Sequence, residues 1–217
     1  MVRRVVLTGG IATGKSYVLS RFSPLGAPVL DADDLARAVS APDGAAWRQL
    51  RDRFGPEMFE ADGQLDRRAL GALVFADAGA RADLNAIVHP HVRAAITAWF
   101  DRLDRQAASV PGIVAIPLYF ESPRAERVDR VVVTACQEAT QLARVMARGL
   151  REPEARQRIA AQLPTAQKVR RADHAIWTDG THADTDRRVA EVWGLLSAGD
   201  SRQETGDRRQ ETGDEGG

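Results

Sequence analysis

This sequence of 217 residues has a single cysteine, Cys136, and no apolar run that approaches the roughly eighteen residues of a membrane-spanning helix. One cysteine excludes an internal disulfide framework and fits a reducing compartment, so we expect a cytoplasmic protein. The apolar run near the N-terminus stops at Leu7, which is too short for a signal peptide. We therefore expect no association with a membrane.

Lysine and net charge are also scarce. Among the 30 basic residues only Lys15 and Lys168 are lysines, and 30 acidic residues balance the total. A neutral chain does not gain affinity from broad neutralisation of phosphate backbones, so we expect no nucleic-acid partner. Any chemistry that needs a lysine has two candidates.

The C-terminal segment 200–217 has almost no apolar residues and repeats Arg-Gln-Glu-Thr-Gly-Asp at 202–207 and 209–214. Such a composition predicts a disordered tail without a core of its own. The tail carries a charge of about −3, which leaves about +3 on the rest of the chain.

In the rest of the chain, β-branched runs alternate with helical patterns, and this order predicts a parallel α/β sheet. The expected strands are 4–7, 28–30, 113–116, 130–134 and 175–177. The long stretch between the second and third strands has helical spacing only. We therefore expect a core formed by 1–34 and 111–199, interrupted by a helical substrate-binding insert over 35–110.

The first expected strand runs directly into a glycine-rich loop that matches the Walker A pattern GxxxxGK[ST], and a helical pattern follows. The backbone N–H groups of such a loop converge on phosphate oxygens. Its lysine reaches the β and γ phosphates, and its hydroxyl can ligate Mg²⁺. The predicted ATP-binding residues of this P-loop are Gly9, Gly10, Ile11, Ala12, Thr13, Gly14, Lys15 and Ser16.

Acidic side chains follow the second strand at Asp31, Asp33 and Asp34. Ligands collect at the carboxyl ends of parallel strands, so we expect these acids beside the P-loop. If the extended conformation continues, Asp31 and Asp33 share a side. One could then hold Mg²⁺ through water while the other accepts a proton from an attacking hydroxyl. Helix capping by Asp33 or Asp34 is the alternative use.

The sequence lacks motifs that are typical of two classes of nucleotide-binding protein. The third strand does not end in the Asp-Glu pair that closes many ATPase Walker B strands. The guanine-recognition motif Asn-Lys-x-Asp is also absent, because neither lysine lies in such a context. These absences disfavour motor ATPases and GTPases.

Arginines concentrate after the fourth strand. The pattern over 137–151 predicts one helix with Arg144, Arg148 and Arg151 on the same face. Guanidinium groups grip phosphate oxygens and stabilise charge on a transferring phosphoryl group. A solvated helix face is the plainer interpretation of such a run, but downstream of a P-loop we expect a lid over about 144–171.

A longer set of motifs runs from Val5 to about Gly180. In order, it comprises Leu7-Thr8-Gly9-Gly10-Ile11, Gly14-Lys15-Ser16, Asp31-Ala32-Asp33, Phe54-Gly55, Asp62-Gly63-Gln64-Leu65-Asp66-Arg67-Arg68, Val74-Phe75, His89-Pro90, Pro117-Leu118 with Glu121, Gln141-Leu142 with Arg144 and Arg148, Arg158 to Gln162, and Ala172-Asp173. By this ordered set the chain resembles the dephospho-CoA kinase family.

The resemblance implies a P-loop kinase fold: a parallel five-stranded sheet flanked by helices, with a helical substrate-binding insert and a lid. It also implies transfer of the ATP γ-phosphoryl group to the 3′-hydroxyl of the ribose of dephospho-CoA, with Mg²⁺ as the cofactor. ATP and dephospho-CoA would then be the partners of this chain.

The same resemblance implies roles for single residues. Asp33 would be the general base and contact the acceptor, and Asp31 would be a Mg²⁺-binding or orienting carboxylate together with Ser16. Lys15 and Arg144 would act with Asp33 in catalysis, and Arg148 would contact ATP. His89 and Glu121 occupy motif positions that we assign to substrate binding.

The chain departs from the family pattern at two positions. Tyr17 stands where the family usually has threonine, and Ser16 keeps the metal-binding hydroxyl. Asp179 stands where an asparagine usually precedes glycine, and a carboxylate cannot donate an amide hydrogen bond to adenine.

Two alternative functions share parts of these motifs. A P-loop kinase of another small hydroxylated metabolite, such as a nucleoside, gluconate or shikimate, would have the same loop and strand-end acids. A non-enzymatic nucleotide-binding switch would bind ATP without releasing ADP in response to an acceptor. We expect the protein to be a monomer or a weak homo-oligomer.

Overall fold

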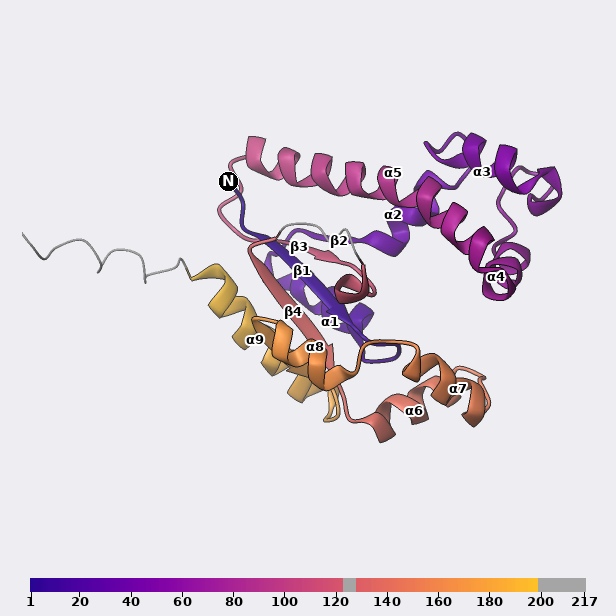
Figure 1. Cartoon of the computed structure of the whole chain (residues 1–217). Coiled ribbons are helices and arrows are strands. Elements are labelled where there is room, and N and C mark those ends of the chain that lie inside the picture. The colour runs from indigo at the N-terminus through magenta and orange to yellow at the C-terminus, as the bar shows by residue number, and fades with distance from the viewer. Residues whose placement is uncertain (123–127, 199–217) are drawn as a thin grey trace, which may run out of the picture.

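The computed structural model describes residues 1–122 and 128–198, in which five parallel strands form one sheet in the order β2-β3-β1-β4-β5 (Figure 1). The strands are β1 (Arg4–Gly9), β2 (Val29–Asp31), β3 (Gly112–Ala115), β4 (Arg130–Ala135) and β5 (His174–Trp177). The five expected strands are confirmed to within two residues at each end, because β-branched runs suit a sheet covered on both faces. The tail predicted over 200–217 lies outside the described residues.

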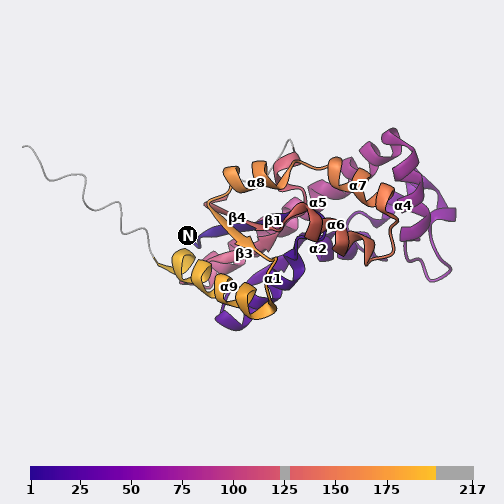
Figure 2. The same ribbon diagram turned by 90° about the horizontal axis from the view of Figure 1, so that it is seen from below.

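Helices cover both faces of this sheet. In chain order they are α1 (Lys15–Phe22), α2 (Ala32–Val39), α3 (Trp47–Phe54), α4 (Arg67–Ala76), α5 (Ala78–Arg105), α6 (Glu138–Met146), α7 (Glu152–Ala160), α8 (Thr165–Arg171) and α9 (His182–Ser197). Figure 2 shows α1 and α9 together on one side of the sheet, with α8 on the other. The predicted α/β class with a parallel sheet is confirmed.

Side chains of β1 alternate between two apolar clusters, as the period of a strand requires. Val5 and Leu7 join the cluster that α1 and α9 build with Phe22. Val6 points to the opposite face and joins the cluster that contains Trp99 of α5. The P-loop after β1 is therefore anchored by a strand that is buried from Val5 to Gly9.

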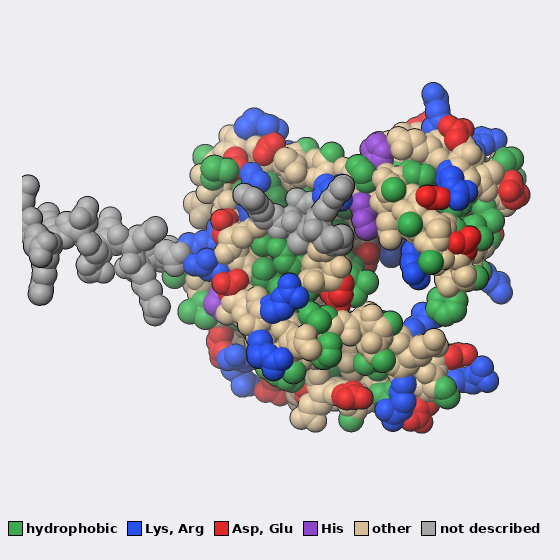
Figure 3. All heavy atoms as spheres, in the orientation of Figure 1, with side chains coloured by type: hydrophobic (Ala, Val, Ile, Leu, Met, Phe, Trp, Pro, Cys, Tyr) green, Lys and Arg blue, Asp and Glu red, His purple; other side chains and the backbone are tan. Residues whose placement is uncertain are grey.

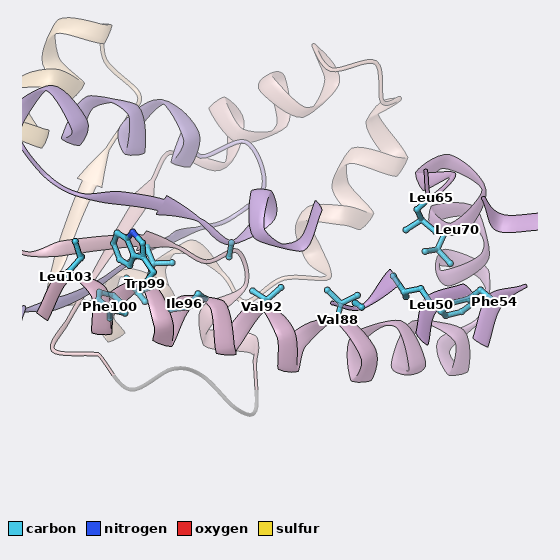
Figure 4. Close-up of a cluster of buried hydrophobic side chains, with 14 of the residues drawn as sticks. Leu50, Phe54, Leu65, Leu70, Val88, Val92, Ile96, Trp99, Phe100 and Leu103 are labelled. Carbon is cyan, nitrogen blue, oxygen red and sulfur yellow. The ribbon is translucent and has the colours of Figure 1, made fainter. Parts of the chain in front are cut away.

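Helix α5 connects the sheet to the helices inserted between β2 and β3 (Figure 1). Its apolar row begins against the sheet and ends against α3 and α4, as Figure 4 shows. In that order the labelled side chains are Leu103, Phe100, Trp99, Ile96, Val92, Val88, Leu50, Phe54, Leu65 and Leu70. One continuous core thus spans the sheet and the helices of residues 32–105, whose assignment as a substrate-binding insert stays a prediction.

The helix after β4 is shorter than the expected 137–151 segment, so that prediction was wrong. Helix α6 ends at Met146, and the chain turns at Gly149, whose φ of 93° is a left-handed conformation that favours glycine. A new helix, α7, begins after Arg151. The arginines at 144, 148 and 151 therefore do not share one helix face, because the turn separates them.

Candidate active site

The P-loop connects β1 to α1 at the carboxyl edge of the sheet. Gly14 is the N-cap of α1 with φ 88°, a backbone conformation that side chains disfavour. No side chain caps the first turn of α1, so the amide groups there have no capping partner. Together with the positive end of the helix dipole, these amides form a site for an anion such as phosphate.

Lys15 lies in the first turn of α1 with its ammonium group buried. Its Nζ lies 3.6 Å from Asp31 Oδ2 and donates no hydrogen bond within the described part of the chain. A buried ammonium without a hydrogen-bond acceptor is costly, and an incoming phosphate oxygen would remove that cost. The geometry therefore fits the predicted role of Lys15 as the phosphate-binding cation.

Asp31 and Asp33 do not continue an extended strand, so the condition under which the two were expected to share a side is not met. Helix α2 begins at Ala32, and Asp31 caps it by accepting a hydrogen bond from the Asp33 amide at 2.9 Å. Asp31, rather than Asp33 or Asp34, is thus the capping residue. Because α2 begins at Ala32, Asp33 lies in its first turn, where the Asp33 carboxylate has no partner among the described residues.

A pocket of about 920 Å³ opens beside these acids, between α2, α4, α5 and the segment that follows β3. Figure 3 shows the surface hollowed between the part that carries α3 and α4 and the part that carries α6 and α7. Asp33, His89 and Glu121 all line the pocket. The structure therefore brings together the three residues that the sequence analysis assigned to substrate binding.

The wall of this pocket formed by α4 and α5 is cationic. Arg67 and Arg93 line it, and neither forms an ion pair with a carboxylate of the described chain. Burial lowers the pKa of Arg67, and the charge of Arg37 lowers it further. Partial desolvation also lowers the pKa of His89, and the charge of Arg93 adds to this shift. This wall suits an anionic group of a ligand.

Glu121 is held by the second lysine of the chain. Lys168 Nζ lies 2.8 Å from Glu121 Oε1, and the Lys168 side chain is only 1% exposed. The Leu163 amide donates a hydrogen bond of 3.0 Å to the same oxygen. Glu121 therefore belongs to the pocket wall with its charge already paired inside the protein.

Three side chains that the sequence analysis left without a role bind the backbone of the P-loop: Gln141, Gln162 and Thr178. Gln162 Oε1 accepts a hydrogen bond from the Ile11 amide at 2.9 Å, and Gln141 Nε2 donates to the Ile11 carbonyl at 2.8 Å. Thr178 Oγ1 donates to the Thr13 carbonyl at 3.0 Å. The only sequence signal for Gln141 and Gln162 was their membership of family motifs, because contacts across such separations leave no local pattern.

Arg144 also contacts the backbone of the P-loop. Its guanidinium group donates to Thr178 Oγ1 at 2.9 Å, to the Thr178 carbonyl and, more weakly, to the Ala12 carbonyl at 3.4 Å. Arg144 thus connects the P-loop to the end of β5. Arg148 lies in the turn after α6 and is exposed.

Ser16 and Asp31 are the predicted metal ligands. Ser16 is exposed in the first turn of α1, and Asp31 ends β2 beside Lys15. Both offer oxygen donors, which Mg²⁺ prefers. Within residues 1–122 and 128–198, no group of three or more His, Cys, Asp or Glu side chains has the arrangement of a metal site.

Comparisons with known proteins agree with the motifs. A family model described as dephospho-CoA kinase matches residues 3–184. A dephospho-CoA kinase of Geobacillus kaustophilus is 44% identical over 200 residues, which cover 90% of this chain and 99% of the relative. A solved dephospho-CoA kinase from Campylobacter jejuni has a TM-score of 0.69 at 27% identity, covering 91% of this chain and 98% of the other. A crystal structure of a Thermus thermophilus protein has a TM-score of 0.73 at 35% identity, covering 90% of this chain and 98% of the other.

Proposed function

Since this chain belongs to the dephospho-CoA kinase family, we infer that it transfers the γ-phosphoryl group of ATP to the 3′-hydroxyl of the dephospho-CoA ribose, giving coenzyme A and ADP. The observation that carries this function in the structure is one arrangement at the carboxyl edge of the sheet. There the Lys15 ammonium of the P-loop pairs with Asp31 but donates no hydrogen bond within the described residues, and the pocket lined by Asp33 opens next to it. A donor site and an acceptor site are thereby adjacent.

In the transfer step, the acceptor hydroxyl oxygen attacks the γ-phosphorus while the bond to the β–γ bridging oxygen breaks, and ADP leaves. We propose that the Asp33 carboxylate accepts the hydroxyl proton. Support comes from its place at the pocket and from the lack of a partner that would occupy its oxygens. A base within hydrogen-bond reach of the attacking hydroxyl contributes roughly 10²–10⁴-fold to the rate.

Lys15 would neutralise charge on the β and γ phosphates, and the uncapped amides of α1 would bind their oxygens. Arg148, exposed in the turn after α6, is free to reach the bound nucleotide. Arg144 is committed to Thr178 and Ala12, so we assign it to bracing the P-loop rather than to contact with the transferring group.

The donor set also supports a bound Mg²⁺. The Ser16 hydroxyl and the Asp31 carboxylate would hold it, because both present oxygen at the edge of the P-loop. When bound, Mg²⁺ supplies neutralisation of phosphate charge. Asp31 therefore has two uses, since its Oδ1 caps α2 while its Oδ2 faces Lys15.

The cationic wall of the pocket suits the acceptor. Dephospho-CoA carries a diphosphate between its ribose and its pantetheine arm, and Arg67 and Arg93 offer guanidinium groups for these oxygens. His89, whose pKa is lowered, stays neutral near pH 7 and can donate or accept a hydrogen bond there. Glu121 shapes this pocket while its charge is paired with Lys168.

The direct test is release of ADP and formation of coenzyme A from ATP and Mg²⁺ with a panel of acceptors. The panel contains dephospho-CoA, a nucleoside, gluconate and shikimate. We expect product only with dephospho-CoA. ADP release with another acceptor would favour a different metabolite kinase, and ATP binding without acceptor-dependent ADP release would favour a switch.

Among the helices of residues 1–122 and 128–198, none combines the length and the apolar composition of a membrane-spanning segment. A cytoplasmic location, a monomeric or weakly oligomeric state and the absence of a nucleic-acid partner remain proposals. The expected lid over 144–171 also remains a proposal. Helices α7 and α8 lie within that range.

A further inference from the structure

Two consecutive residues after α7 link the P-loop to the acceptor pocket. The Gln162 side chain accepts a hydrogen bond from the Ile11 amide at 2.9 Å. The next backbone amide, that of Leu163, donates to Glu121 Oε1 at 3.0 Å. Ile11 belongs to the nucleotide-binding loop and Glu121 lines the pocket, so this dipeptide joins the two substrate sites by a short path.

At its nucleotide end the link meets a P-loop residue whose two backbone polar groups are both hydrogen-bonded to glutamine side chains. While Gln162 holds the Ile11 amide, Gln141 Nε2 donates to the Ile11 carbonyl at 2.8 Å. A Cβ at Gly10 would lie 2.8 Å from Gln141 Nε2 and 3.3 Å from Gln162 Oε1. Only glycine lets both amide side chains approach this closely, so the loop backbone and the two glutamines fit together as one unit.

At its acceptor end the link is fixed by α8. Lys168, only 1% exposed, pairs with Glu121 at 2.8 Å. Arg171 lies over the Phe120 ring at 4.6 Å from its centroid, one residue before Glu121. The pocket wall around Glu121 is therefore connected to α8 by a charge pair with a buried lysine and by a ring contact.

We propose that Gln162 is a positioning residue for phosphoryl transfer: it orients Ile11 in the P-loop while Leu163 fixes Glu121 in the pocket wall, so the donor and acceptor sites keep one spacing. The proposal rests on the function inferred above. Gln162 touches the P-loop backbone through its side chain and acts on the reaction only through that loop. Its neighbour Leu163 needs no particular side chain for its part, because the contact uses the backbone amide.

The consequence concerns turnover more than binding. In-line transfer needs the hydroxyl and the γ-phosphorus at near-attack distance, and a displacement of about 1 Å can cost about 10²-fold in rate. ATP would still be bound by Lys15 and the α1 amides, and the acceptor by its own pocket. Loss of Gln162 should therefore lower kcat while the KM for each substrate changes little.

Three variants of the full chain test this idea. Gln162→Met keeps the side-chain length and removes the acceptor oxygen, and we expect kcat with dephospho-CoA to fall by about 10- to 100-fold. Gln162→Glu restores an acceptor for the Ile11 amide, and we expect kcat to recover to within about threefold of the original chain, with a higher KM for ATP from charge repulsion. Gln157→Met changes an exposed glutamine of α7 outside the link and should leave kcat unchanged.

Thermal unfolding midpoints and the two KM values are measured for each variant. A loss of kcat in Gln162→Met with an unchanged unfolding midpoint, together with recovery in Gln162→Glu, supports a positioning role. A kcat in Gln162→Met equal to that of Gln157→Met overturns it. Loss of kcat in parallel with the unfolding midpoint, without recovery in Gln162→Glu, also overturns it, because that result describes a structural residue. If the unaltered chain makes no coenzyme A, the proposed function itself is wrong.

Discussion

Lys168 and Glu121 form an ion pair across the gap between α8 and the pocket wall, with Nζ and Oε1 2.8 Å apart and the Lys168 side chain almost fully buried. Glu121 keeps 23% of its side-chain surface exposed, so the two partners are desolvated to different degrees. Loss of the ion pair should cost more free energy at the buried Lys168 ammonium than at the Glu121 carboxylate. The carboxylate would still accept a hydrogen bond from the Leu163 amide.

This asymmetry predicts unequal effects of single substitutions. Glu121→Gln leaves a buried charge unpaired and should lower the free energy of unfolding by about 3 kcal/mol, whereas Lys168→Met should cost less. The double variant Glu121→Gln/Lys168→Met should be more stable than Glu121→Gln alone. Urea denaturation of the three variants measures these differences, and additive effects would contradict the pairing.

Removal of the Lys15 ammonium should abolish most activity and leave the fold intact. In Lys15→Ala no buried hydrogen bond is broken, because Nζ donates none in the described chain. We expect turnover to fall by about 10²–10³-fold or more, since a charge that binds the transferring phosphoryl group is lost. Assays of ADP release and circular dichroism melts test this prediction. Near-normal turnover would refute the assignment of the P-loop as the donor site.

Asp31 at the end of β2 and Asp33 at the start of α2 should differ in role, one structural and one chemical. Asp33→Asn should lower kcat by about 10²–10⁴-fold at an unchanged unfolding midpoint, because Asp33 caps nothing. Asp31→Ala removes the α2 cap and should also lower stability by about 1 kcal/mol. If Asp33→Asn proves as destabilising as Asp31→Ala without a specific loss of kcat, Asp33 is not the base.

The cationic wall predicts that Arg67 contributes to binding of the acceptor, through its diphosphate, and not to binding of ATP. Arg67→Gln should raise the KM for dephospho-CoA about tenfold, equivalent to about 1.4 kcal/mol, and leave the KM for ATP unchanged. Arg68→Gln is the matched control, because Arg68 is the next residue of α4, is exposed like Arg67, and does not line the pocket. Equal effects of the two substitutions would show that Arg67 has no special contact with the acceptor.

The pKa of His89 predicts a pH-dependent stability. Burial and Arg93 lower this pKa in the folded state, so the unfolded chain binds the proton more tightly. The stability is fully present above the ordinary histidine pKa of about 6.5 and is lost as pH falls through the lowered folded-state value. Between pH 7.5 and 5 the unfolding midpoint of the original chain should fall more steeply than that of His89→Gln. Parallel slopes would contradict the shift.

The sequence predicted the sheet and the P-loop because both leave local patterns. Each strand is an apolar, β-branched run, and the loop that ends in Lys15 is defined by spacing alone. The end of α6 was missed because the helical pattern continues past Met146, and only the turn at Gly149 interrupts it. The cap at Asp31 was missed because α2 begins one residue after the strand, closer than the sequence pattern suggested.

The contacts of the glutamines could not have been predicted in the same way. Gln162 meets Ile11 from 151 positions away, and Gln141 meets the same residue from 130 positions away. A side chain that bonds to a distant backbone imposes no periodicity on its own segment, so its role becomes visible only when the helices are folded. The use of Glu121 as a partner of Lys168 was hidden for the same reason.

Helix α5 has 28 residues and is about 42 Å long at 1.5 Å per residue. Trp99, Phe100 and Leu103 pack one end against the sheet, and the residues of α5 that line the pocket lie farther along the helix, from Ile96 back to Ala82 (Figure 4). A tilt of a few degrees at the sheet end moves the far end by about 2 Å over such a length. The apolar contacts between α5 and the sheet therefore determine the position of the acceptor pocket. The alignment of the acceptor hydroxyl with the γ-phosphorus thus depends on packing far from any reacting atom.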